Sequence, residues 1–226
     1  DVCSSDLAGF CTYTNVDADV DELAQGIGYD SPLCPLTIRR PMNPDGTAGA
    51  EKPAGEVGEI CFSGPQVFLG YLGDPENTAK TVSKEGICYT GDIGTYDDKG
   101  LHFSGRAKLV IKPKGYQVFP EDVERHIHAK LKDKVALVSV VGVEHEVFSE
   151  GIMAFVECLD GQTLTPEEVI AACEDISAYS RPSHVVILKV GEIPLNRVAK
   201  TDYLTLRERA SQVVQELRSR GGWDRG

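Results

Sequence analysis

The part of the chain after Arg106 alternates between short apolar stretches and helix-start signals, and this alternation limits the folds open to it. Pro120 is followed by two acidic residues, as in the first turn of a helix. Thr165 and Pro166, with Glu168 three residues after the threonine, have the spacing of a capping box. The predicted elements are a short β-hairpin at 109–119, a helix at 120–131, strands at 135–143 and 152–157, a helix after Thr165, a strand at 185–188 and a helix from about Thr201. This order predicts a small α+β domain in which helices flank an antiparallel or mixed sheet.

The first part of the chain mixes short apolar pieces with glycine and proline clusters. Residues 59–63 and 67–71 have the composition of strands. Asp74 followed by Pro75 predicts the start of a short helix, and the run 97–100 predicts a hairpin turn. Strands and loops are therefore expected to dominate this part.

Charge and hydropathy exclude several classes of partner. Lys and Arg total 23 against 35 Asp and Glu, which gives a net charge of -12. A net negative charge disfavours sequence-independent binding to the negatively charged phosphate backbone of a nucleic acid. No nucleic-acid partner is therefore expected. No apolar run approaches the roughly 20 residues of a membrane span. We expect a cytoplasmic protein, and the C-terminal residues carry no peroxisomal tripeptide.

The seven cysteines show neither a metal-binding nor a disulfide pattern. Their number is odd and no pair has C-x-x-C spacing. Hydrophobic residues make up 41% of the chain, enough for a buried core. We expect reduced thiols, several of them in that core.

Three polar or glycine-bearing clusters are not explained by secondary-structure propensity. They lie at 89–92, 105–124 and 196–200. Each alone has an ordinary explanation, namely a turn, a solvated hairpin and the exposed start of a helix, and a single short motif is weak evidence. Their order within one chain is far more specific.

That order resembles the acyl-adenylate-forming, or AMP-binding, superfamily, which includes acyl-CoA synthetases, coumarate–CoA ligases and beetle luciferases. The resemblance extends over essentially the whole chain. The matching segments are GEVGEI at 55–60, GPQV at 64–67 with GY at 70–71, PENTA at 75–79, YTGD at 89–92, GRAKLVIK at 105–112, GYQV at 115–118, PEDVE at 120–124 and PLN at 194–196 leading to Lys200. The residues around Lys112 are closer to CoA ligases than to peptide-synthetase adenylation domains.

The resemblance implies a nucleotide site and a hinge. Asp92 would bind the two ribose hydroxyls of the adenylate, with Thr90 beside it and Arg106 assisting. Lys108 matches the hinge about which the family's small C-terminal domain rotates. Residues 1–106 would then be the C-terminal end of the large domain, mainly β and barrel-like, and residues 107–226 the small mobile domain.

The resemblance also implies two catalytic lysines. Lys200 matches the lysine that enters the site for adenylation, although Ala199 stands where the family usually has glycine. Lys112 belongs to the face that turns inward for thioester formation. Gly115 resembles the glycine that lets pantetheine pass along bare backbone.

The first residues match the family less well. Ser5 and Asp6 look like a degraded form of its aromatic-Gly-x-Thr-Glu motif, and would offer a hydroxyl to phosphate and a carboxylate to Mg²⁺. The Ser/Thr/Gly-rich loop that holds the β- and γ-phosphates has no counterpart in these residues. We therefore expect a piece of a longer protein, inactive on its own.

The resemblance implies an ATP-dependent carboxylic acid–CoA ligase that uses Mg²⁺ and coenzyme A. Such an enzyme forms an acyl-adenylate and pyrophosphate, and then a thioester. Two alternatives stay open. The first is a non-catalytic fragment or interaction module. The second is an adenylation domain that loads the phosphopantetheine thiol of a carrier protein. The sequence does not identify the carboxylic acid.

Overall fold

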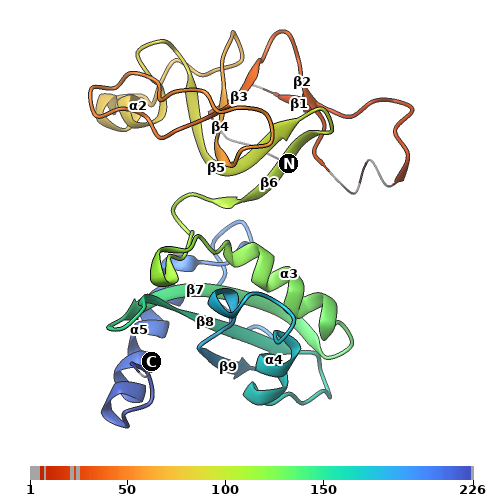
Figure 1. Ribbon diagram of the computed structural model, residues 1–226, viewed down its shortest axis with the longest axis vertical. Coiled ribbons are helices and arrows are strands. Elements are labelled where there is room, and N and C mark those ends of the chain that lie inside the picture. The colour runs from red at the N-terminus through yellow and green to blue at the C-terminus, as the bar shows by residue number, and fades with distance from the viewer. Residues whose placement is uncertain (1–5, 8, 21–22, 24–25, 225–226) are drawn as a thin grey trace. The chain divides into compact units, whose positions relative to one another are not determined.

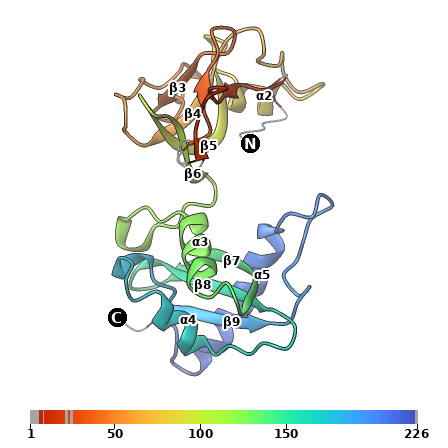
Figure 2. The same cartoon turned by 90° about the vertical axis from the view of Figure 1, so that its right-hand side faces the viewer.

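The computed structural model describes residues 6–7, 9–20, 23 and 26–224 of the chain. They divide into two compact units, Asp1–Lys108 and Leu109–Gly226 (Figures 1 and 2). No helix in the described part is long and apolar enough to cross a membrane.

The first unit is mainly β, as expected. Its described elements are β1 (Thr12–Tyr13), β2 (Tyr29–Asp30), β3 (Leu36–Arg39), β4 (Gly58–Phe62), α2 (Pro75–Thr81), β5 (Cys88–Asp97) and β6 (Gly100–Arg106). Strands β3, β4, β5 and β6 pair in that order into an antiparallel sheet, while β1 and β2 pair with each other. Ile60, Phe62 and Leu101 are fully buried in its core.

Two local predictions in this unit are confirmed. The side chain of Asp74 caps α2 by accepting a hydrogen bond from the Asn77 amide, and Pro75 occupies the first turn. The predicted hairpin turn joins β5 and β6, with Asp97 opposite Gly100.

The strand predicted at 67–71 is wrong. Only Val67 makes a strand-like contact, an isolated bridge to Leu7. Gly70 has a φ of 140°, and the Tyr71 amide donates to Oγ1 of Thr78 in α2 rather than to a strand. The segment therefore turns towards the helix instead of extending a sheet.

The second unit has the predicted α+β order and a mixed sheet. Its described elements are the short 3-10 turn η1 (Pro113–Gly115), α3 (Pro120–Lys130), β7 (Val135–His145), β8 (Ser149–Cys158), α4 (Pro166–Ala172), the 3-10 turn η2 (Ala178–Ser180), β9 (His184–Leu188) and α5 (Tyr203–Ser219). Strand β8 pairs antiparallel with β7 and parallel with β9. The predicted capping box at Thr165 is present, with Glu168 as its reciprocal partner.

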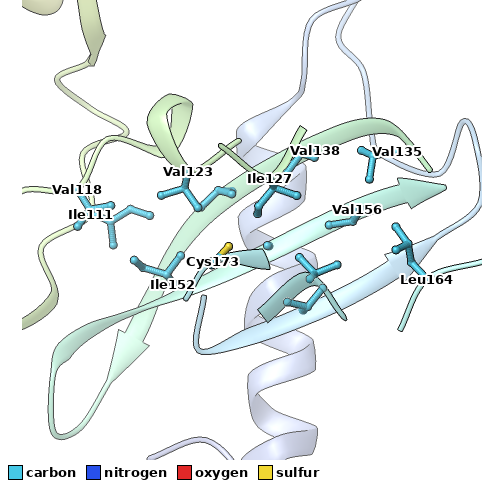
Figure 3. Close-up of a cluster of buried hydrophobic side chains, with 14 residues drawn as sticks. Ile111, Val118, Val123, Ile127, Val135, Val138, Ile152, Val156, Leu164 and Cys173 are labelled. Atoms are coloured by element: carbon cyan, nitrogen blue, oxygen red, sulfur yellow. The ribbon is translucent and has the colours of Figure 1, made fainter. Parts of the chain in front are cut away.

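Side-chain alternation along the central strand β8 places a separate core on each face of this sheet. Ile152, Ala154 and Val156 point into the cluster beneath α3 and α4, part of which is drawn in Figure 3. Met153 and Phe155 point into the cluster that α5 covers. Trp223 also lies in that second cluster and is 4% exposed.

The hairpin predicted at 109–119 is reduced to a single bridge between Ile111 and Val118. Pro113 has no amide to donate, and Lys114 and Gly115 both have positive φ, 52° and 85°. The backbone between the two bridge residues therefore curls into η1 instead of forming a ladder.

Five of the described cysteines carry free thiols, Cys34, Cys61, Cys88, Cys158 and Cys173, and Cys158 is the one among these five that is not buried. Burial raises the pKa of the Cys34 and Cys88 thiols to about 12.

Candidate nucleotide site and lysine loops

Asp92 and Arg106 are opposite each other on β5 and β6 and form an ion pair. Nε of Arg106 lies 2.9 Å from Oδ1 of Asp92. The Asp92 side chain is 3% exposed and that of Arg106 is 49% exposed. The pair thus holds a buried carboxylate at the end of the β5–β6 hairpin, with the arginine on its solvent side.

The part of β5 just before Asp92, where the pairing register with β4 shifts, is held by hydrogen bonds to β4. Thr90 Oγ1 donates to the Ile60 carbonyl at 2.8 Å and accepts from the Asp92 amide at 3.1 Å. Gly91 has a φ of 75°, a conformation that favours glycine. Its amide donates to Oε1 of Glu59 at 3.1 Å. The contacts that the Thr90 hydroxyl makes within the chain are therefore structural. They fix the direction of the backbone at Asp92.

Glu59 is the residue at this site that the sequence did not single out. Burial raises the pKa of its carboxyl above the usual range, and the negative charge of Asp92 adds to the shift. Glu59 occurs in the GEVGEI segment, where a carboxylate enters an otherwise apolar strand. That break in the strand pattern is the signal that could have identified it.

A cleft of about 830 Å³ brings several of these residues together within the first unit. Asp6, Thr90 and Lys108, all candidates from the sequence, line it. Tyr71 also lines the cleft, and its hydroxyl donates to Oδ2 of Asp6 at 2.9 Å. Ser5 lies outside the described residues.

Asp6 is one carboxylate rather than a complete metal site. In the described part of the chain, no group of three or more His, Cys, Asp or Glu side chains could hold a metal ion. One carboxylate is nevertheless what Mg²⁺ commonly takes from a protein when substrate phosphates and water supply its other ligands. The Asp6 carboxylate is therefore suited to be one protein ligand of a nucleotide-bound Mg²⁺.

The segment that carries Lys112 lies in the second unit. The Lys112 side chain is exposed, directly before η1. Gly115 follows with φ 85°, and a Cβ added there would meet no atom within 4 Å. The backbone conformation therefore favours glycine, and the space beside it is open to a ligand.

Lys200 lies in an exposed loop that Asn196 organises. Oδ1 of Asn196 accepts hydrogen bonds from the backbone amides of Val198 and Lys200, at 3.0 and 3.1 Å. The backbone amide of Asn196 donates to the Lys200 carbonyl. Ala199 between them has a φ of 58°. The residue that replaces the family's usual glycine thus occupies a left-handed conformation, which costs a non-glycine residue about 1 kcal/mol.

Comparison with known proteins decides the family. A family model described as the AMP-binding enzyme C-terminal domain matches residues 122–200. The chain is 34% identical over 200 residues to the mitochondrial medium-chain acyl-CoA ligase ACSF2 of Macaca fascicularis, covering 87% of this chain and 31% of the relative. It is 42% identical over 128 residues to 4-coumarate–CoA ligase 2 of Nicotiana tabacum, covering 55% and 23%. The chain belongs to the AMP-binding superfamily.

Within the superfamily, the chain corresponds to the C-terminal portion. The crystal structure of ATP-bound MatB from Rhodopseudomonas palustris matches 91% of this chain and 39% of its own length, with a TM-score of 0.79 and 28% identity. The chain thus spans less than a third of the two curated ligases and about two fifths of this structure. Most of a superfamily enzyme's length is not represented in these residues.

Proposed function

We propose that this chain supplies the C-terminal part of an ATP-dependent carboxylic acid–CoA ligase. The observation that carries the proposal is the buried Asp92 carboxylate, which is paired with Arg106 and directly follows Thr90 and Gly91, two residues that line a cleft large enough for a nucleotide. A carboxylate can accept two hydrogen bonds at once, which suits the paired hydroxyls of a ribose. The names of the relatives, acyl-CoA and coumarate–CoA ligases, support thioester formation with CoA.

In the first half-reaction, the carboxylate oxygen of the acid attacks the α-phosphorus of ATP, and the bond to pyrophosphate breaks. Lys200 places its ammonium between the acid and the α-phosphate, where negative charge builds up. Asp92 and Arg106 hold the adenosine end. Asp6 would provide one carboxylate ligand to a bound Mg²⁺, which would supply charge neutralisation at the phosphates.

In the second half-reaction, the CoA thiol gives up its proton and attacks the acyl carbon, and AMP leaves. Lys112 and the open backbone at Gly115 serve this step. We further propose that Lys108, the last residue of the first compact unit, is the hinge that lets one domain present the two lysines in turn.

The direct test is ligand binding by the 226-residue chain. AMP titrated into the chain is expected to shift backbone amide resonances of Thr90, Gly91 and Asp92. Unchanged resonances in this segment at millimolar AMP would contradict the proposed nucleotide site. A cytoplasmic location belongs to the same proposal and is tested by cell fractionation.

The acceptor thiol is tested separately in a full-length enzyme that carries this chain as its C-terminal part. Free CoA is expected to release AMP from the acyl-adenylate at a much higher rate than a carrier protein with an attached phosphopantetheine. The reverse preference would favour an adenylation domain.

A further inference from the structure

The β7–β8 hairpin holds the segment from Lys112 to Lys114 at two backbone positions, through Glu150 of β8 and Phe148 of the turn. Oε2 of Glu150 accepts a hydrogen bond from the Lys112 amide at 2.5 Å. The Phe148 carbonyl accepts from the Lys114 amide at 2.8 Å. Because Pro113 between them has no amide, both amides available from residue 112 to residue 114 are bonded to this hairpin.

The same turn also holds the Lys114 side chain. Nζ of Lys114 lies over the ring of Phe148, 4.1 Å from its centroid. A cation at this distance from an aromatic face is attracted to it. Lys114 therefore contacts Phe148 of the β7–β8 turn through both its backbone amide and its ammonium.

The conformation held in this way is not one the segment would favour alone. Lys114 has a φ of 52°, which costs a lysine about 1 kcal/mol relative to an ordinary helical or extended backbone. Strained residues persist where surrounding contacts determine their conformation, and they concentrate at functional sites. Glu150 holds the backbone before Pro113 and Phe148 holds the backbone after it. These contacts keep Lys114 in the strained conformation.

The turn is itself anchored in the second unit. His145 is 2% exposed, and its Nδ1 accepts from the amides of Val147 and Phe148, both at 3.2 Å. The imidazole stacks on the Phe148 ring with centroids 4.4 Å apart and also contacts Trp223 at 5.5 Å. The support for the Lys112 segment therefore extends into the core beneath α5.

The neighbouring strand leaves room for the Glu150 carboxylate. Gly142 is opposite Ile152 on β8, and a Cβ added to it would come 3.3 Å from Oε1 of Glu150 and 2.8 Å from a methyl of Ile111. A larger residue at 142 would displace either the carboxylate or Ile111. The packing is thus consistent with a specific placement of Glu150.

We infer that Glu150 is a positioning residue for the second half-reaction, acting through the Lys112 amide to hold the Lys112–Gly115 segment in the conformation that presents Lys112. This inference rests on the proposed function of Lys112 and Gly115. Glu150 touches no substrate. Its role is to hold the Lys112 backbone against the β7–β8 hairpin.

The hydrogen bond is tested first in the unmodified 226-residue chain. The Lys112 amide resonance is expected to move with the titration of the Glu150 carboxyl, followed through the Glu150 side-chain carbon. In Glu150→Gln that movement disappears. A Lys112 resonance in the unmodified chain that does not follow Glu150 would overturn the inference, without any substitution that could affect folding.

Amide hydrogen exchange then tests the positioning. Glu150→Leu is expected to speed amide exchange at Lys112 by at least about 10-fold, because the substitution removes one hydrogen bond to a charged group. Glu150→Gln retains an acceptor oxygen and should stay within about 3-fold. Glu146→Leu, at an exposed acid of the same hairpin, is the matched control, and amides 152–156 of β8 report whether the unit stays folded. Equal exchange at Lys112 in Glu150→Leu and Glu146→Leu would overturn the inference.

Activity separates this inference from the proposed function on which it rests. In a full-length enzyme carrying this chain, Glu150→Leu should slow CoA attack on preformed acyl-adenylate by at least about 10-fold while ATP–pyrophosphate exchange changes less than about 2-fold. Glu150→Gln should restore most of the CoA step. If exchange at Lys112 rises but the CoA step is unchanged, the contact is real and the proposed role of the Lys112 segment is wrong.

Discussion

Arg106 Nε lies 2.9 Å from Oδ1 of Asp92, across one register pair of the β5–β6 hairpin. The Asp92 carboxylate is almost fully buried and the Arg106 side chain is half exposed, so the arginine compensates the buried negative charge from the solvent side. This arrangement suits a carboxylate that must remain ionised to accept hydrogen bonds from a ligand.

Asp92→Asn should weaken AMP binding to the chain. Hydrogen bonds to a charged group contribute about 1.5–3 kcal/mol each, so a loss of about 10- to 100-fold in affinity is expected. Asp98→Asn, at an exposed position on the same hairpin, is the control and should bind like the unmodified chain. Isothermal titration with AMP measures both, and equal affinity of the two variants would rule out Asp92 as a ribose ligand.

Limited trypsin digestion should first cut after Arg106 or Lys108. The β6 strand ends at Arg106, and residues 106–108 are exposed. A hinge of this kind opens locally at low cost, which makes it the first site of cleavage. Mass spectrometry of the early fragments identifies the site, and initial cuts within the β7–β8 turn or α5 instead would argue against a hinge at Lys108.

Glu124 should make the second unit lose stability as pH rises towards neutrality. Burial raises the pKa of its carboxyl to about 7, although the Val140 amide donates to Oε1 at 2.7 Å and the Tyr203 hydroxyl at 3.2 Å. The folded state therefore binds the proton more tightly than the unfolded state. The free energy of unfolding then falls between pH 4.5 and about 7, and the loss is complete above that range.

Glu124→Gln should remove this pH dependence. Its amide oxygen can still accept both hydrogen bonds, so the variant should match the unmodified chain near pH 5 and exceed it at pH 8 by about 1–3 kcal/mol. Trp223, the single tryptophan, reports urea unfolding of this unit by fluorescence. Glu208→Gln, on the exposed side of α5, is the control, and parallel stability curves for all three proteins would contradict the assignment.

Ala199→Gly should stabilise the second unit. Ala199 is one of three non-glycine residues with positive φ in the described part of the chain, and glycine relieves that strain at a cost in unfolded-state entropy. The strain of about 1 kcal/mol exceeds that entropy cost of about 0.4–1 kcal/mol, so we expect a net gain of up to about 0.5 kcal/mol in urea unfolding. Ala171→Gly, at an exposed position in the last turn of α4, should instead lose up to about 0.5–1 kcal/mol, and a loss at both positions would show that the Lys200 loop is not strained.

Local signals predicted those parts of the fold that depend on neighbouring residues. Asp74 and Thr165 were recognisable as helix caps because a capping side chain bonds to an amide only a few residues away. The turn from Asp97 to Gly100 was recognisable for the same reason. The mixed sheet followed from the order of apolar stretches and capped helices.

Contacts between distant residues were not predictable in this way. Glu150 meets the Lys112 amide across 38 positions, and Glu59 meets Gly91 across 32. Nothing in the residues beside either glutamate indicates such a partner. The strand predicted at 67–71 failed for a different reason, because the Tyr71 amide bonds to the Thr78 side chain of the nearby helix α2, a contact that strand composition does not predict.

The division of labour between the two lysines is the central claim, and separate assays of the half-reactions test it most directly. In a full-length enzyme carrying this chain, Lys200→Ala should slow ATP–pyrophosphate exchange by about 10²–10³-fold, the usual effect of removing one electrostatic contact to a transition state. It should leave CoA attack on synthetic acyl-adenylate intact. Lys112→Ala should do the reverse. If both variants lose both steps equally, or if Lys112→Ala changes neither, the assignment of one lysine to each half-reaction is wrong.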